Sequence, residues 1–177
     1  VALRQLQNMD SDVIRSAIEV VARMTEAGIH ETLSRGRLDM PVAEWRKMAE
    51  GKTASLFEWC ARAATWDATD ASVHKRLGDC VRRFAVAFQM VDDLKDVVRT
   101  ASGKDPFADI LNRELNAAIL VAVHRSETLK REMSELWARP HLTREEVQSV
   151  ASRIRESGAV GEVLQMVDQE VSAGLDL

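Results

Sequence analysis

The chain is poor in the residues that mark small disulfide- or zinc-stabilised folds. Its 177 residues contain two cysteines, Cys60 and Cys80, which are too few and too far apart for a zinc ribbon or a disulfide framework. Reduced thiols in a cytoplasmic protein are therefore the expectation. A net charge of -4 provides no basic surface for nucleic acid. No apolar run approaches the roughly 18 residues of a membrane span, so we expect no transmembrane segment.

The residue patterns of several enzyme classes are also missing. The histidines show no i,i+4 pair of the zinc-binding helix type, and there is no Gly-rich phosphate loop and no nucleophile elbow. No segment has the alternation of a convincing strand. With three prolines, eight glycines and 46% hydrophobic residues, the composition is typical of a helical protein. The predicted fold class is all-α.

Hydrophobic periodicity, capping residues and helix breakers predict a succession of helices within one domain over residues 1–177. The first helix follows a Ser11 cap, a later one follows a capping box at Thr143-Arg144-Glu145-Glu146, and Gly158 to Gly161 break the chain before the last. The longest apolar run, Ala117 to Val123, is predicted to be a buried helix centre. The expected helices cover residues 11–35, 42–64, 73–99, 109–137, 144–157 and 162–173.

One cluster of acidic residues suggests chemistry. Asp92, Asp93 and Asp96 share a helix face with Gln89 and Arg82 when placed at about 100° per residue. The apolar residues of this segment fill the opposite arc: Phe88, Met90, Val91, Leu94, Val97 and Val98. Carboxylates one turn apart repel each other and raise each other's pKa. Mg²⁺ would relieve this repulsion, since it binds one or two carboxylates with water and phosphate oxygens. The alternative is the solvated face of an amphipathic helix, and the pattern alone does not decide.

For each of two lysines the sequence also allows two interpretations. Lys52 lies in the apolar stripe of the helix expected at 42–64, flanked by Trp45, Met48, Leu56 and Trp59. It either extends to water along its stem or points into a cavity to meet an anion, to which Thr53 could also donate. Lys104 follows Asp96 by eight residues, in a predicted loop. It is either a surface lysine or folds back over whatever the carboxylates bind.

The segment Phe88-Gln89-Met90-Val91-Asp92-Asp93-Leu94-Lys95-Asp96 closely resembles a motif of the all-trans isoprenyl (polyprenyl) diphosphate synthases. This is their second aspartate-rich motif, FQ-x-x-DD-x-x-D. Two further matches follow the family's order: Lys52-Thr53-Ala54-Ser55-Leu56-Phe57 resembles KTA-x-LF, and Gly103-Lys104 with Asp109 resembles GK-x-x-G-x-D. A DDxxD match is weak by itself, but the three matches together argue against chance. The similarity covers roughly residues 20–120.

The resemblance implies an antiparallel helical bundle of the isoprenoid synthase type around a central cavity, with this chain as its C-terminal portion. It also implies a Mg²⁺-dependent prenyltransferase that ionises an allylic prenyl diphosphate and transfers the prenyl group to isopentenyl diphosphate or another acceptor. The implied site residues are Lys52, Asp92 and Asp93 for catalysis, Lys52, Thr53, Gln89 and Lys104 for the diphosphate, and Asp92, Asp93 and Asp96 for the metal.

The chain departs from the family pattern in two respects. No second DDxxD occurs in the sequence, so the family's first aspartate-rich motif is missing from these residues. Arg113-Glu114 aligns with a Gly-Lys pair of the family, and Phe107 aligns with a glycine. An acid therefore stands where the family has a lysine. Either Glu114 turns away from the diphosphate or the co-substrate differs.

These departures keep other functions open. The chain could be a non-catalytic or regulatory subunit of a heteromeric prenyl diphosphate synthase whose partner supplies the first motif. A terpene cyclase of the same fold would need a downstream N-x-x-S/T-x-x-x-E motif, which is not found. The resemblance implies a homodimer, or a heterodimer in the subunit case.

Overall fold

A computed structural model describes residues 9–67, 70–98 and 107–177, and all regular structure within these ranges is helical. The elements are α2 (Ser11–Leu33), α3 (Val42–Ala49), the π-helical turn η2 (Glu50–Ala54), α4 (Ser55–Ala64), α5 (Ala71–Val98), α6 (Ala108–Asn112), α7 (Ala117–Arg125), α8 (Glu127–Trp137), α9 (Arg144–Glu156) and α10 (Ala159–Leu175). The all-α prediction is confirmed.

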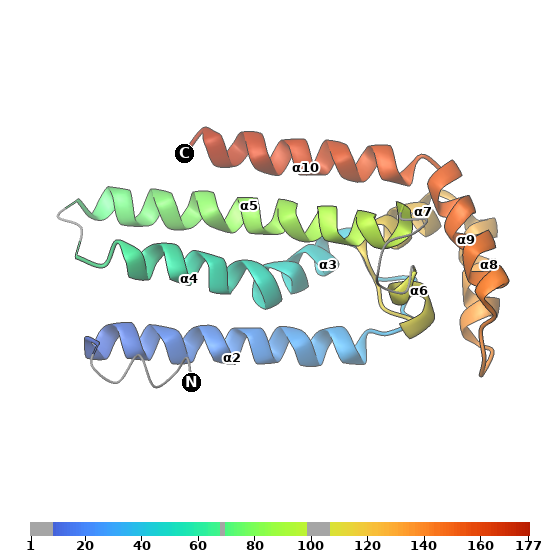
Figure 1. The fold of residues 1–177 in the computed structure, drawn as a ribbon, viewed down its shortest axis with the longest axis horizontal. Helices are drawn as coiled ribbons and strands as arrows, with labels where there is room; N and C mark the ends of the chain where they lie inside the picture. The colour runs from blue at the N-terminus through green and yellow to red at the C-terminus, as the bar shows by residue number, and fades with distance from the viewer. Residues whose placement is uncertain (1–8, 68–69, 99–106) are drawn as a thin grey trace.

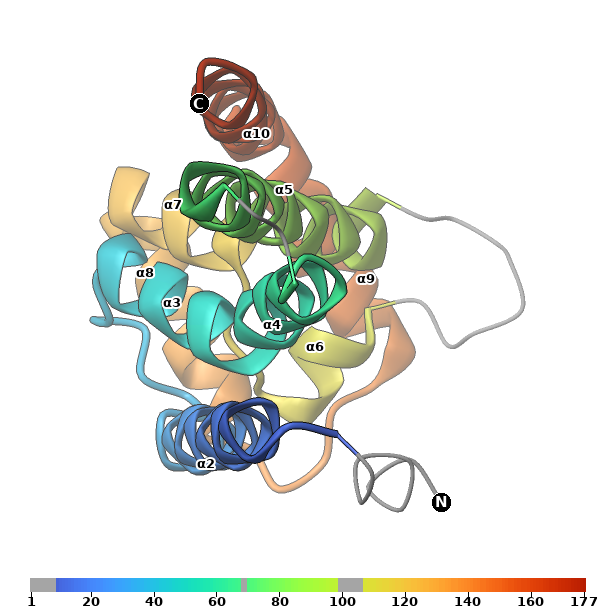
Figure 2. The same ribbon diagram turned by 90° about the vertical axis from the view of Figure 1, so that its left-hand side faces the viewer.

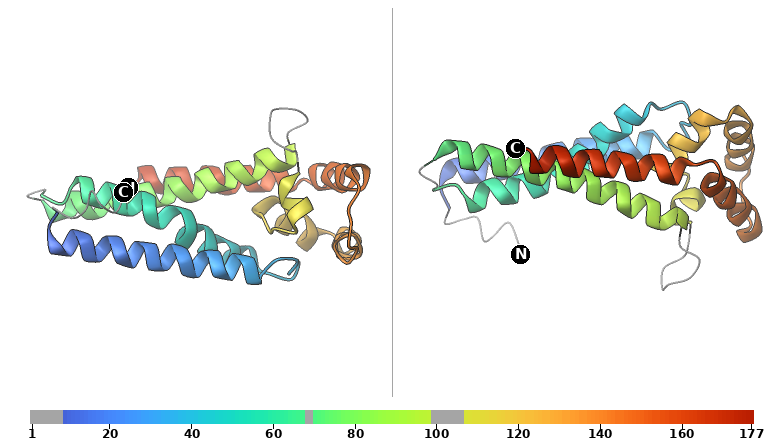
Figure 3. Two further views of the ribbon diagram at one scale, coloured as in Figure 1. Left: turned by 60° about the horizontal axis from the view of Figure 1, so that its bottom comes forward. Right: turned by 90° about the horizontal axis from the view of Figure 1, so that it is seen from above.

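Four of these helices form an antiparallel row. Figure 1 shows α2, α4, α5 and α10 side by side, each running opposite to its neighbour, and contacts link α2 to α4, α4 to α5 and α5 to α10. Figure 2, seen along the row's long axis, shows α2 and α10 at its two edges. Helices α6, α7, α8 and α9 gather at one end, where α8 and α9 cross the direction of the row (Figure 1), and the same end group is seen from two further sides in Figure 3. One end of the row, beside the C-terminal half of α5, therefore carries short helices and the loops between them.

Helix α7 forms the centre of the core. All side chains from Ala117 to Val123 are buried, as the apolar run predicted. This helix contacts α3, α5, α8, α9 and α10, which leaves no side of it facing solvent over that run. An all-round apolar helix is stable only when it is enclosed in this way.

The prediction of one helix over 109–137 is wrong. The chain forms α6, α7 and α8 there, separated by Arg113 in the left-handed region (φ 58) and by two N-caps. Asn116 accepts a hydrogen bond from the Ile119 amide, and Ser126 accepts one from the Leu129 amide. Without glycine or proline in this segment, the breaks carry no strong sequence signal, although Asn and Ser are favoured N-caps.

The prediction of one α-helix over 42–64 needs a correction at its middle. The span is helical throughout, but residues Glu50–Ala54 form a π turn. A π turn shifts the helical phase, so the apolar stripe does not continue through it. Trp45 and Met48 are buried, whereas Leu56 is exposed.

Helix boundaries elsewhere differ by a few residues from those expected. Asp10, and not Ser11, caps α2 by accepting from the Asp12 amide. The capping box at Thr143 and Glu146 is confirmed. Gly158 alone breaks the chain before α10, and Gly161 lies inside that helix.

The edge helix α2 has an uncovered apolar face. Ile18, Val21, Ile29 and Leu33 are all exposed there. A shallow groove of about 330 Å³ lies along this face, lined by Thr25, Gly28, Ile29, Thr32 and Leu33. Among the described helices, none is long and apolar enough to cross a membrane.

Candidate functional site

The three clustered aspartates lie near the end of α5 in three different environments. Asp92 is exposed, and its only described ion pair is a weak one with Lys95 at 3.9 Å. Asp93 is buried, with 6% of its surface accessible. Asp96 is half-buried. The helical wheel therefore predicted a shared face, but not the differences in solvation along it.

The Asp93 carboxylate is held by two N–H donors. Gln89 Nε2 donates to Oδ1 at 3.0 Å, and the Ala117 backbone amide at the start of α7 donates to Oδ2 at 2.9 Å. Burial raises the pKa of Asp93 to about 8, against the lowering effect of these two bonds. Asp93 thus joins α5 to α7, and both of its oxygens are engaged within the protein.

A chain of side-chain hydrogen bonds connects two of the sequence motifs. Thr53 Oγ1 in η2 donates to Gln89 Oε1 at 2.8 Å, and Gln89 in turn donates to Asp93. The position of Gln89 beside the acids is therefore confirmed. The lysine–threonine motif and the aspartate motif, 36 residues apart between Thr53 and Gln89, meet in one polar cluster.

Lys52 is neither buried in an apolar stripe nor directed to the aspartates. Its Nζ donates to both oxygens of Glu31 on α2, at 2.8 and 2.7 Å, and 48% of its side chain is exposed. The prediction that apolar neighbours surround Lys52 is wrong, because the π turn rotates it toward α2. Glu31 was missed by sequence reasoning, since nothing in the sequence pairs residues 21 positions apart.

Asp96 binds the beginning of α6. Its Oδ1 accepts from the Ala108 amide at 2.9 Å and its Oδ2 from the Asp109 amide at 3.1 Å. Burial raises the pKa of Asp96 in spite of these bonds. Lys104 precedes this anchor and lies outside the described residues.

A second layer of polar residues supports the aspartates. Asp109 Oδ2 accepts from Asn116 Nδ2 at 2.8 Å, while Asn116 also caps α7. Burial raises the pKa of Asp109 to about 6, and the charge of nearby Asp96 adds to the shift. Sequence reasoning missed Asn116, although an asparagine directly before a long apolar run is a recognisable N-cap signal.

Two residues that align with glycines of the family pattern, Phe107 and Arg113, have the positive φ angles that glycine adopts most easily. Phe107 and Arg113 have φ values of 67° and 58°, and they are the non-glycine residues with positive φ among those described. For L-residues this region costs of order 1–2 kcal/mol. Glu114 forms an ion pair with Arg35 at 2.5 Å, so the carboxylate that replaces a lysine is neutralised by a residue just beyond α2.

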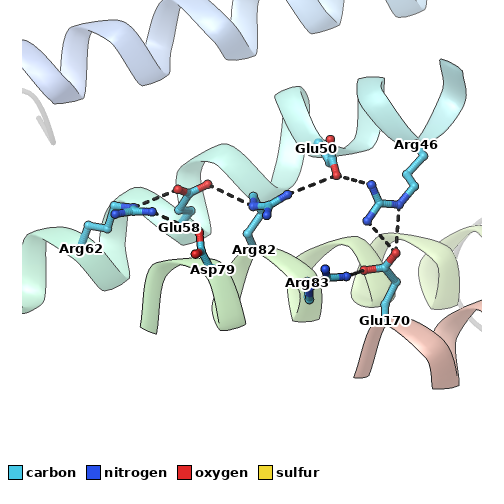
Figure 4. A network of polar contacts seen from close by, with 8 residues as sticks. All are labelled: Arg46, Glu50, Glu58, Arg62, Asp79, Arg82, Arg83 and Glu170. Atoms are coloured by element: carbon cyan, nitrogen blue, oxygen red, sulfur yellow. Dashed lines mark hydrogen bonds and ion pairs between the residues drawn. The ribbon is translucent and has the colours of Figure 1, made fainter. Parts of the chain in front are cut away.

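A network of ion pairs fixes η2 and α4 against α5 (Figure 4). Its members are Arg46, Glu50, Glu58, Arg62, Asp79, Arg82, Arg83 and Glu170. Arg82, which the helical wheel placed on the face of the aspartates, pairs with Glu50 at 3.4 Å and with Glu58 at 3.7 Å. These contacts hold the π turn that carries Lys52 and Thr53 in place beside Gln89.

The carboxylates near the end of α5 fit part of the ligand set of a divalent metal ion. No three His, Cys, Asp or Glu side chains in the described ranges come close enough to hold a metal ion by themselves. Asp92 and Asp96, one helical turn apart, are exposed and half-buried, whereas Asp93 is buried; both oxygens of Asp96 and of Asp93 accept a hydrogen bond each. Mg²⁺ commonly takes only one or two carboxylates and completes its shell with water and substrate oxygens. Two carboxylates from α5 therefore suit a site shared with a ligand.

Known proteins resemble this chain in sequence. The polyprenyl synthetase family model matches residues 1–154. A prenyl transferase from Cyanidium caldarium is 20% identical over 98% of this chain and 53% of its own length. A (2E,6E)-farnesyl diphosphate synthase from Mycobacterium bovis is 31% identical over 62% of this chain and 32% of its own length.

Solved structures resemble it in fold. Heptaprenyl diphosphate synthase from Staphylococcus aureus superimposes with a TM-score of 0.88 at 19% identity, covering 95% of this chain and 53% of that one. A polyprenyl synthase from Caulobacter crescentus, solved with calcium and isoprenyl diphosphate, gives 0.87 at 19% identity and covers 97% of this chain and 55% of that one.

The chain spans about half the length of the first relatives it matches, with 40% of the prenyl transferase from Cyanophora paradoxa and 53% of the one from Cyanidium caldarium. The fold of the described residues is that of the isoprenyl synthases. The family match extends over most of the sequence and includes the lysine–threonine motif, the aspartate cluster and the segment that follows it. This chain therefore belongs to the polyprenyl synthetase family.

Proposed function

We propose that this chain forms the diphosphate-binding side of a prenyltransferase that transfers an allylic prenyl group to isopentenyl diphosphate or another acceptor. The observation that carries the proposal is the hydrogen-bonded chain from Thr53 through Gln89 to Asp93. It links two motifs that the family uses for the same ligand, and it leaves Lys52 and Asp92 on exposed positions beside that chain.

Asp92 and Asp96 would hold Mg²⁺ in this proposal, with Asp93 in a supporting position. When bound, the ion would neutralise negative charge on the leaving diphosphate. Asp93 orients Gln89 and the beginning of α7, as its two hydrogen bonds indicate. This division of roles follows from the solvation of the three carboxylates.

The cationic and polar residues would bind the diphosphate itself. The Lys52 ammonium stabilises the charge that develops on the diphosphate as the allylic C–O bond breaks. Gln89 Nε2 has a second N–H besides the one it gives to Asp93, and Thr53 would redirect its one hydroxyl hydrogen from Gln89 to a diphosphate oxygen. Lys104 keeps its predicted role at the diphosphate.

A second candidate function is a non-catalytic subunit of a heteromeric prenyl diphosphate synthase. The ion pair between Glu114 and Arg35 supports it, because a carboxylate replaces a lysine near the proposed diphosphate position. Such a subunit would bind diphosphate without forming a product. The dimeric state, as homodimer or heterodimer, and a cytoplasmic location are parts of the same proposal.

Product analysis separates the two functions. The protein is incubated with Mg²⁺ and labelled allylic diphosphates of different length, with and without isopentenyl diphosphate, and the products are identified by mass. Elongated prenyl diphosphates are expected from the enzyme. Binding of the allylic diphosphate without any product would instead support the subunit.

The contribution of Lys52 is tested by calorimetric titration of inorganic pyrophosphate in the presence of Mg²⁺. Hydrogen bonds to charged groups contribute about 1.5–3 kcal/mol, so Lys52→Ala should weaken binding about tenfold or more. Lys47→Ala is the matched control, because Lys47 is an exposed lysine of α3 in the same span. Equal affinities for wild type and Lys52→Ala would remove Lys52 from the proposed site.

A further inference from the structure

The ammonium of Lys52 already has a carboxylate partner. Two of its three N–H donors are directed at Glu31, at 2.8 and 2.7 Å, and the side chains are 48% and 31% exposed. Neither residue forms another ion pair within the described part of the chain. The pair of Lys52 and Glu31 therefore carries no net formal charge.

The geometry points to Glu31 as a built-in competitor that a diphosphate must displace from Lys52, and which thereby sets the affinity of the site. This inference rests on the proposed function, since it takes Lys52 to be a diphosphate ligand. It concerns a residue outside the motifs that carry the family resemblance.

The close approach of α2 and η2 holds the pair together. A Cβ on Gly51 would lie 2.8 Å from the Cβ of Ala27, so the two backbones are nearly in contact at this point. Lys52 directly follows Gly51, and Glu31 lies one helical turn after Ala27 on the same side of α2. The two side chains therefore project from beside this close contact between the two elements. Their pairing is a consequence of backbone packing.

The competition predicts in which direction the affinity for diphosphate changes when the charge of Glu31 is removed. A diphosphate within hydrogen-bonding distance of Lys52 brings several negative charges close to the Glu31 carboxylate, so that Glu31 must leave or repel the ligand. An exposed ion pair contributes about 0.2–1 kcal/mol. Removing the negative charge of Glu31 should therefore strengthen diphosphate binding by a factor of about two to five.

A double-mutant cycle tests the inference. Inorganic pyrophosphate with Mg²⁺ is titrated calorimetrically into wild type, Glu31→Gln, Lys52→Ala and the double variant. The control is Glu26→Gln, which removes an exposed carboxylate from the same helix. Thermal unfolding checks that each variant is folded. We expect Glu31→Gln to bind about two- to fivefold more tightly than wild type, Glu26→Gln to bind as wild type does, and the gain to disappear when Lys52 is absent.

Three other outcomes have distinct meanings. If Lys52→Ala weakens binding while Glu31→Gln leaves it unchanged or weakens it, Glu31 is no competitor and the inference is overturned, while the diphosphate role of Lys52 stands. If Lys52→Ala binds pyrophosphate as wild type does, Lys52 is no diphosphate ligand, and the inference about Glu31 is overturned together with that role. A gain from Glu31→Gln that persists without Lys52 would also overturn the inference, because it would reflect only long-range charge.

Discussion

Single side chains at the site differ more in their surroundings than their shared motif suggests. Asp92, Asp93 and Asp96 occupy one stretch of α5, yet one is exposed, one is buried with two N–H donors, and one binds the start of α6. Their chemical roles diverge accordingly. Asn116, which is 1% exposed, supports the cluster indirectly through its hydrogen bond to Asp109.

We predict that Asn116→Ala destabilises the fold. The substitution removes the N-cap of α7 and leaves a buried acceptor of Asp109 without its donor. The free energy of unfolding should fall by about 1–3 kcal/mol, measured by urea denaturation. Asn112→Ala is the control, since Asn112 is exposed at the end of α6, and it should change stability by less than about 0.5 kcal/mol. Equal effects of the two variants would contradict the capping role.

Among the elements, the π turn η2 determines where the lysine–threonine motif points. It interrupts the helix from Val42 to Ala64, so Lys52 faces Glu31 on α2 while Thr53 faces Gln89 on α5. A regular α-helix would have kept Lys52 in the stripe of Trp45 and Met48. The turn also brings η2 into near contact with α2 at a glycine.

We predict that Gly51→Ala destabilises this contact. The new Cβ would lie 2.8 Å from the Ala27 Cβ, so a backbone must shift. Overpacking of this kind costs about 1–3 kcal/mol. The matched variant is Gly28→Ala on α2, where a Cβ meets nothing within 4 Å. It should stabilise the protein by about 0.5–1 kcal/mol through helix propensity. Thermal unfolding of both variants measures the contrast, and a stable Gly51→Ala would mean that the helices pack less closely.

For the whole molecule, ion pairs that join distant segments hold the row of helices together. Glu170 of α10 accepts from Arg46 at 2.6 Å and from Arg83 at 3.2 Å, and its side chain is only 13% exposed. It connects α3 and α5 to the last long helix (Figure 4). The network of eight residues contains four arginines and four acids, so its formal charge is balanced.

Glu170→Gln should therefore unbalance a half-buried network. We expect the free energy of unfolding to fall by about 1–3 kcal/mol, less than for a fully buried pair because part of the network reaches solvent. Asp168→Asn, an exposed site on the same helix, should have little effect. Denaturant unfolding of both variants at low and at 0.5 M salt is the measurement. A loss for Glu170→Gln that vanishes in salt would show that the network acts only as surface charge.

Local sequence signals predicted the elements with strong periodicity or caps. The capping box at Thr143, the buried run from Ala117 to Val123 and the long helix of the aspartates are found as expected. The wheel also placed Gln89 beside Asp93, which the hydrogen bond confirms. It failed for Phe88 and Val98, which belong to the apolar arc but are exposed. Neighbouring helices, and not hydrophobicity, decide which part of an apolar arc is covered.

By itself, the sequence determined an all-α chain whose motifs resemble those of the prenyl diphosphate synthases, because helical period, caps and motif spacing are local properties of the chain. The tertiary structure alone decided that Lys52 pairs with Glu31, that Asp93 is buried while Asp92 is not, and that Glu114 meets Arg35. A charged side chain takes its partner and its solvation from whichever distant segment packs against it. That information arises only when the helices are assembled.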